Sequence, residues 1–136
     1  MKKQNLLLLC LCVLLLQGCG NQVSVKGRVT FPDGKPLTRG EVRFQTPSFV
    51  ATGDIQPDGT YVLGSRGAND GIPKGTYTVT VSAYEDAGST AGMSAEDAKP
   101  ANPLIDLKYS SPTTSQLSCD VQGATIFDIP VEPFKK

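Results

Sequence analysis

This sequence of 136 residues contains no histidine. The side chains whose context suggests chemistry are thiols, carboxylates and phenols. Without an imidazole there is no Ser-His-Asp or Cys-His nucleophile pair, no HExxH zinc site and no histidine general base. Among the four cysteines, Cys19 has the most informative context. It directly follows Leu16-Gln17-Gly18, at the end of a leucine-rich run near the N-terminus.

Residues 1–18 have the organisation of an export signal. A basic start precedes an apolar run of 11 residues, which is too short for a membrane span of about 20 residues. Leu16, Gln17, Gly18 and Cys19 together resemble a bacterial lipobox, in which a small residue before the cysteine lets the signal peptidase reach the backbone. We therefore predict a lipoprotein signal peptide over 1–18, with Leu16, Gln17 and Gly18 as peptidase recognition residues. The thiol of Cys19 is the predicted lipid attachment site, through a thioether bond.

Residues 19–22 form the predicted lipidated tether. At about 3.5 Å per residue, the tether keeps the following domain within about 10–14 Å of the lipid. Stable anchoring needs two or three acyl chains, such as palmitate, because one chain binds only marginally. Gly20 is not the aspartate that retains lipoproteins at the inner membrane of well-studied Gram-negative bacteria. We therefore expect an exported protein anchored in the cell envelope, at the outer membrane rather than the periplasmic face of the inner membrane.

Charge argues against nucleic acid as a partner. The full chain has 13 basic and 13 acidic residues, and removal of 1–18 takes away Lys2 and Lys3. The mature chain would then carry 11 positive and 13 negative side chains, a net charge of −2. Proteins that bind nucleic acids usually present a strongly basic surface to the phosphates, which this composition does not provide.

The acidic residues offer two kinds of site, each with a simpler structural interpretation. Asp33, Asp58 and Asp70 each precede a glycine and could contribute to a calcium site, but the sequence has no EF-hand loop. We expect them to serve as turn residues, and we predict no metal site. Glu85-Asp86 and Glu96-Asp97 could form an acid–base pair, but they lie in a polar, glycine-containing segment and are expected to be solvated.

Cys119 and the tyrosines lie in or next to strand-like stretches. If Cys19 carries lipid, Cys119 has no disulfide partner within the chain, and we interpret it as a small core residue rather than a reactive thiol. Tyr61 and Tyr77 fall on apolar faces and are predicted core residues. Tyr84 and Tyr109 lie near strand ends, and we expect them to be the exposed pair able to form an aromatic platform for sugars.

Short alternating stretches predict the elements that position these residues. Apolar and polar residues alternate with period two, and glycine-rich or proline-rich turns separate the stretches. Gly27 lies on an apolar face, where it allows a bulge or close packing. Residues 85–103 interrupt the pattern as a loop, with a short helical turn expected at Ser94–Asp97, and residues 104–109 are expected to pair briefly at an edge. The predicted strands cover residues 23–31, 39–46, 49–55, 60–63, 76–84, 117–122 and 127–131.

The order of these motifs resembles the carboxypeptidase regulatory-like, or transthyretin-like, domain family, in small lipid-anchored versions found in planctomycetes. The resemblance spans about 23–131. Its first half consists of Val25-Lys26-Gly27-Arg28-Val29-Thr30-Phe31, Asp33-Gly34-Lys35-Pro36-Leu37, Val42-Arg43-Phe44 and Pro57-Asp58-Gly59-Thr60-Tyr61. Its second half consists of residues 72–81, Lys108-Tyr109, Ser115, Leu117, Val121 and the closing Phe127-x-Ile129.

The resemblance implies an all-β fold, a seven-stranded antiparallel β-sandwich of the transthyretin/prealbumin-like, Greek-key type. It also implies an accessory module without enzymatic activity or cofactor. Two enzyme classes with related folds do not match. Hydroxyisourate hydrolases depend on histidines and a terminal Tyr-Arg-Gly-Ser, whereas this chain ends in Glu132-Pro133-Phe134-Lys135-Lys136, and intradiol dioxygenases hold iron with two histidines.

The sequence therefore predicts a signal peptide over 1–18, a tether over 19–22, a β-sandwich domain over 23–131 and a tail over 132–136. The functional hypothesis is a non-catalytic, lipid-anchored cell-envelope module for protein interaction or envelope structure. The alternative is a carbohydrate-binding module at the cell wall or surface, with wall polysaccharide as its partner. The ligand-binding residues are not specified by the sequence.

Overall fold

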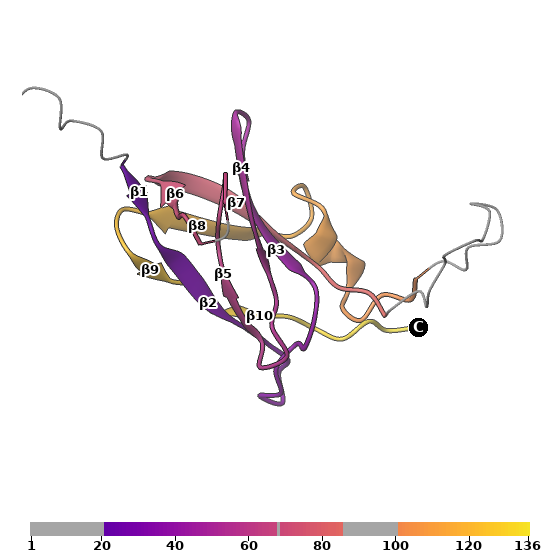
Figure 1. The fold of residues 1–136 in the computed structure, drawn as a ribbon. Helices are drawn as coiled ribbons and strands as arrows, with labels where there is room; N and C mark the ends of the chain where they lie inside the picture. The colour runs from indigo at the N-terminus through magenta and orange to yellow at the C-terminus, as the bar shows by residue number, and fades with distance from the viewer. Residues whose placement is uncertain (1–20, 68, 86–100) are drawn as a thin grey trace, which may run out of the picture.

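The computed structural model describes residues 21–67, 69–85 and 101–136 (Figure 1). The predicted signal peptide, its recognition residues and Cys19 lie outside this described part, as do the expected helical turn at Ser94–Asp97 and the Glu96-Asp97 pair. Within the described residues, no helix is long and apolar enough to cross a membrane. Ten strands and one 3-10 helix make up the described fold, so it is all-β as predicted.

The larger sheet contains the strands that the sequence marks most clearly. Its order is β4 (Phe49–Asp54), β3 (Glu41–Thr46), β7 (Gly75–Ser82) and β8 (Leu117–Val121), and every neighbouring pair is antiparallel. β7 lies between two partners, which explains its β-branched residues on both faces. The predicted alternation is confirmed in β3 and β8, where every second residue is buried.

The second sheet is centred on β2 (Val25–Thr30). β5 (Thr60–Val62) pairs with it antiparallel, whereas β9 (Thr125–Ile126) and β10 (Ile129–Pro130) pair with it in parallel. The prediction of a wholly antiparallel fold is therefore wrong for the C-terminal strand. Alternation of apolar residues identifies the buried face of a strand, but it carries no information about the direction of its neighbour.

Two local elements differ from the sequence-based expectation. β1 (Gln22–Val23) pairs with β6 (Ile72–Pro73). β6 lies between the predicted strands 60–63 and 76–84, where no strand was expected. The brief edge pairing expected at 104–109 is confined to Leu104 and Ile105, because the chain then turns into the 3-10 helix η2 (Leu107–Ser110). Asp106 caps this helix by accepting a hydrogen bond from the backbone N–H of Lys108 at 2.9 Å.

The core forms a single cluster of side chains from both sheets, with β2 and β5 opposite β3, β7 and β8 (Figure 1). Burial of this apolar surface is the main driving force for folding. Most of the largest fully buried side chains come from the apolar faces of the predicted strands. These are Tyr61, Phe44, Leu63, Ile129, Val25, Val29, Val42, Val79 and Val81. Leu37, Ile72 and Ile105 are fully buried as well, although no inward face was predicted for them.

β2 runs parallel to residues 125–131, and the ladder between them is interrupted at Phe127 and Asp128. We call the interrupted part, where Gly27 and Arg28 face Phe127 and Asp128, the seam. A methyl group on Gly27 would overlap the carbonyl oxygen of Phe127, so the close packing predicted for this glycine is confirmed. The Tyr61 hydroxyl donates a 2.6 Å hydrogen bond to the same oxygen. On the other side, Asp128 Oδ1 accepts a hydrogen bond from the backbone N–H of Arg28 at 2.9 Å. Side chains thus replace the missing ladder hydrogen bonds.

Candidate functional site

Cys119 lies in β8 with 5% of its surface exposed, next to Tyr77 of the neighbouring strand. Its interpretation as a core residue is confirmed. Burial raises the pKa of its thiol above the ordinary value, and the nearby Asp120 carboxylate acts in the same direction. Both effects keep the thiol protonated at neutral pH, which is the unreactive form.

The expected exposed tyrosine pair does not form. Tyr61 and Tyr77 are buried as predicted, and Tyr84 is exposed, but Tyr109 is only 7% exposed. The prediction that Tyr109 is exposed is wrong. Tyr109 belongs to η2, which turns its ring against the core instead of leaving it at a strand end. Lys108 Nζ lies 5.0 Å from the centre of the Tyr109 ring.

Asp33 and Asp58 act as turn residues, as predicted. Asp33 Oδ1 accepts a hydrogen bond from the backbone N–H of Lys35, which lowers the pKa of the carboxyl. Asp58 Oδ1 accepts hydrogen bonds from the hydroxyl and the backbone N–H of Thr60, at 2.6 and 3.0 Å, with the same effect on its pKa. In the described part of the chain, no three acidic or cysteine side chains are placed to hold a metal ion.

Asp70 organises the loop that begins at Gly64. Its carboxylate accepts hydrogen bonds from the backbone N–H groups of Ser65, Arg66 and Gly67 at 2.6, 3.0 and 3.0 Å. These hydrogen bonds, led by the one from Ser65, lower the pKa of Asp70. Asp70 is therefore a turn residue, as predicted, but it holds a whole loop instead of a single tight turn.

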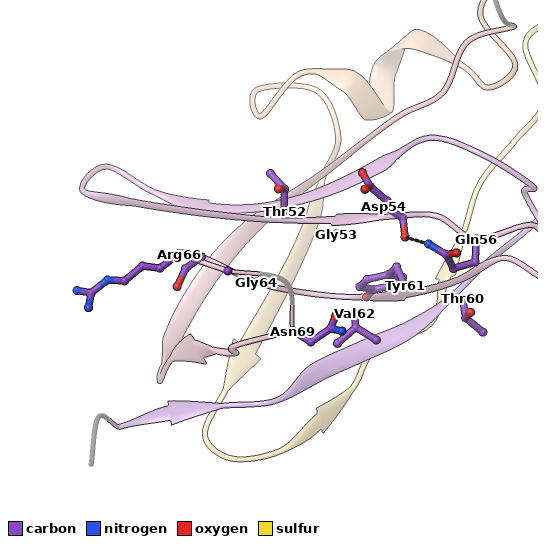
Figure 2. Close-up of a pocket in the computed structure, with 12 residues that line it drawn as sticks. Thr52, Gly53, Asp54, Gln56, Thr60, Tyr61, Val62, Gly64, Arg66 and Asn69 are labelled. Carbon is purple, nitrogen blue, oxygen red and sulfur yellow. Dashed lines mark hydrogen bonds between the residues drawn. The ribbon is translucent and has the colours of Figure 1, made fainter. Parts of the chain in front are cut away.

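This loop forms one wall of a groove with a volume of about 620 Å³ (Figure 2). The other walls come from β4 and β5, the edge strands of the two sheets, which meet beside Gly64. Two backbone hydrogen bonds between Thr52 and Gly64, of 3.1 and 2.9 Å, attach the loop to β4. Gly53 allows β4 to approach the Val62 carbonyl, because a side chain there would overlap it. The groove is lined by Thr52, Gly53, Asp54, Gln56, Thr60, Tyr61, Val62, Gly64, Ser65, Arg66, Gly67 and Asn69.

The chemical character of the groove is polar. Its lining includes the hydroxyl residues Thr52 and Thr60, the carboxamide residues Gln56 and Asn69, and Asp54, whereas the guanidinium of Arg66 points away from it (Figure 2). The Gln56 side chain donates a 3.3 Å hydrogen bond to the backbone carbonyl of Asp54. The Ser65 hydroxyl is buried and has no hydrogen-bond partner. Sequence analysis missed this groove, because it arises where two sheet edges meet and no local pattern marks it.

Three segments that each carry an exposed apolar side chain meet at the end of the molecule opposite β1. Tyr84, Leu107 and Phe134 are 42%, 50% and 37% exposed. Tyr84 bridges to Pro103, and the backbone N–H of Phe134 donates to the carbonyl of Leu104. Residues 103–104 therefore lie between the end of the β7 segment and the C-terminal residues. In Figure 1 this end contains the helical turn and the C-terminus. We refer to Tyr84, Leu107 and Phe134 as the apolar end.

Glu85 has a structural role at the base of the apolar end. Its carboxylate accepts a 2.9 Å hydrogen bond from the side-chain amide of Asn102, and its backbone N–H donates to the Asn102 carbonyl. Its side chain is exposed, as expected for a solvated acid. Asp86, the other member of the proposed pair, lies outside the described residues.

Comparison with known proteins gives a fold likeness without a functional assignment. No family model matches the sequence, and no curated protein gives a match. Among solved structures, a DUF3823 family protein from Bacteroides ovatus is similar, with a TM-score of 0.50 and 17% sequence identity. The match covers 82% of this chain and 45% of that one, so this chain spans less than half the length of its structural neighbour. At this identity the likeness concerns the fold alone.

Proposed function

We propose that this chain is a non-catalytic, lipid-anchored module of the cell envelope that binds another envelope protein through its apolar end. The proposed fold is a seven-stranded, transthyretin-like sandwich of the Greek-key type, as in carboxypeptidase regulatory-like domains. The sheet order supports this if β9 and β10 count as one interrupted strand and the two-residue β1 and β6 are set aside. Three strands then face four.

The position of the apolar end carries the proposal. The described chain begins beside β1, and the apolar end lies at the other end of the domain (Figure 1). A lipid on Cys19, two residues before the described chain, would hold the β1 end near the membrane. The apolar end would then face away from the lipid, where another protein can reach it. Exposed aromatic and aliphatic side chains are typical anchors of such contacts.

The anchor is tested by metabolic labelling with an alkyne analogue of palmitate. We expect label on the wild-type protein and on Cys119→Ala, and none on Cys19→Ser, which should also leave the membrane fraction. Label that persists in Cys19→Ser would contradict the proposed attachment site. The Cys119→Ala variant keeps Cys19 and therefore controls for labelling of the other mature thiol.

The interaction is tested in intact cells with a photoreactive phenylalanine analogue at position 107. A matched control places the same residue at position 126, because Ile126 is 72% exposed but lies in β9, outside the apolar end. We expect one recurrent protein adduct from position 107, its loss in Cys19→Ser, and no such adduct from position 126. Equal adducts from both positions, or none from position 107, would overturn the proposed binding surface.

The carbohydrate-binding alternative has lost the observation that first favoured it. Burial of Tyr109 leaves Tyr84 without the second ring of the expected platform. For this reason the apolar end is not proposed as a sugar site.

A further inference from the structure

We propose that the groove between β4, β5 and the 64–70 loop is a binding site for a short, neutral saccharide. This site is separate from the apolar end, and the proposal does not depend on the lipid anchor. Its volume of about 620 Å³ falls within the range of about 300–1,000 Å³ typical of small-molecule sites.

The lining favours a neutral ligand with many hydroxyl groups. Thr52 offers a hydroxyl, and Gln56 and Asn69 offer carboxamides. The Thr60 hydroxyl donates to Asp58 and remains free to accept a hydrogen bond. Hydroxyl and carboxamide groups both donate and accept hydrogen bonds. An anion would find no cation in the groove, since the guanidinium of Arg66 points outward (Figure 2). A purely apolar ligand would leave these groups without partners.

Ser65 supplies an independent indication of a ligand. Its hydroxyl is buried in the groove wall without any hydrogen-bond partner among the described residues. Buried polar groups in native proteins are nearly always paired, so a group left without a protein partner indicates an ordered water or a ligand. Rotation about the Cα–Cβ bond of Ser65 would turn this hydroxyl toward a saccharide hydroxyl in the groove, without any movement of the backbone.

The groove is also formed before any ligand binds. Asp70 fixes three successive N–H groups of the loop, and Thr52 and Gly64 exchange two backbone hydrogen bonds. The backbone of residues 64–67 is therefore held in place before binding, which reduces the entropy cost of a weak, hydrogen-bonded ligand. No aromatic ring is exposed in the groove, because Tyr61 is 1% exposed, so we expect weak binding, with Kd of about 1 mM.

The test uses the protein purified from cells in detergent micelles and labelled with nitrogen-15. The probes are cellotriose, maltotriose and the trisaccharide of N-acetylglucosamine, each at about 10 mM, which exceeds the expected Kd. The peptide tetra-alanine, blocked by N-terminal acetylation and C-terminal amidation so that it carries no charge, is tested in the same way. We expect at least one trisaccharide to shift the backbone amide signals of Thr52, Gly64 and Asn69 with saturation, while those of Ser118 stay in place.

Two variants separate binding from folding. Ser65→Ala should weaken saccharide binding about fivefold to tenfold, since one hydrogen bond to the ligand is lost. It should not lower the unfolding temperature, because it removes a hydroxyl that has no partner in the free protein. Ser118→Ala, on the exposed side of β8, should leave both quantities unchanged.

The proposal is overturned by any of three results. The first is that no trisaccharide moves the groove amides. The second is that Ser65→Ala binds as well as the wild type. The third is that tetra-alanine moves these amides and the saccharides do not, which would assign the groove to a peptide.

Discussion

The seam and the 64–70 loop both hold irregular backbone in place through side-chain hydrogen bonds, but in opposite environments. In the seam, two strands that are 100 positions apart in sequence meet over Gly27, and the buried Tyr61 hydroxyl satisfies the Phe127 carbonyl. In the loop, the exposed carboxylate of Asp70 binds three N–H groups within five residues. Water can replace a lost hydrogen bond in the loop, but it does not reach the buried Tyr61 hydroxyl of the seam. The seam should therefore control global stability, and the loop only its own shape.

Gly27→Ala should give the largest loss, because the added methyl group overlaps the Phe127 carbonyl and forces the two strands apart. We expect the free energy of unfolding to fall by about 3 kcal/mol, at the upper end for overpacking. Urea denaturation measures this change. Gly123→Ala is the matched control, since no atom lies within 4 Å of the new methyl group, and it should be close to neutral. Equal effects of the two substitutions would remove close packing as the role of Gly27.

Tyr61→Phe should have the second-largest effect, a decrease of about 1–2 kcal/mol in the free energy of unfolding. It leaves the Phe127 carbonyl oxygen without its partner in the seam. Tyr77→Phe is the comparison, since its hydroxyl donates a 2.7 Å hydrogen bond to Pro73 in β6, a two-residue strand at the edge of the fold. We expect a smaller loss there, about 0.5–1 kcal/mol. A larger loss for Tyr77→Phe in urea denaturation would contradict the special role of the seam.

Asp128→Ala tests whether location in the seam matters for stability even where the side chain is exposed. Asp128 is exposed like Asp70, but it belongs to the seam. Its loss leaves the backbone N–H of Arg28 without its partner, and we expect a decrease of about 0.5–1 kcal/mol in unfolding free energy. Asp120→Ala is the control, since Asp120 binds only the side chains of Thr76 and Gln122, and it should cost less. If Asp120→Ala costs as much, the backbone contact in the seam has no special importance.

The sequence predicts which residues of the seam point inward, but not that the two strands pair with each other. Alternation placed Gly27 and Tyr61 on inward faces, and the glycine itself indicated close packing. It did not indicate that residues 125–131 run parallel to β2, because pairing over 100 positions depends on the whole topology. Tyr109 shows the same limit. A short 3-10 helix has too few residues for a periodic signal, so its ring was placed on the surface instead of against the core.

The groove was harder to predict than the strands. Asp70-Gly71 was recognised as turn chemistry, but its three hydrogen-bond donors lie three to five residues earlier, beyond the reach of a single β-turn. The alternation in residues 49–55 and 60–63 predicts two strands, but it says nothing about where their polar residues meet. That they face a common space depends on the meeting of two sheet edges at Thr52 and Gly64, which only tertiary structure determines.

Asp70→Asn should have the smallest effect on global stability and a clear effect on the loop. The three N–H donors lower the pKa of Asp70 below its ordinary value of 3.8, so the carboxylate form is favoured by the folded loop. Its contribution is therefore complete above the ordinary pKa and is lost only as the pH falls through the lowered value. A nitrogen-15 NMR titration of the wild type should show the amides of Ser65, Arg66 and Gly67 moving together, with a midpoint below 3.8.

In Asp70→Asn this titration should disappear, and the same three amides should exchange with solvent faster at every pH, because a neutral carboxamide is a weaker acceptor. The urea midpoint at pH 6 should stay at the wild-type value, since water reaches the exposed donors. A midpoint of titration at or above 3.8 would contradict the hydrogen-bond geometry of the loop. A marked fall in the urea midpoint would mean that the loop, like the seam, supports the whole fold, and the contrast between the two regions would then be wrong.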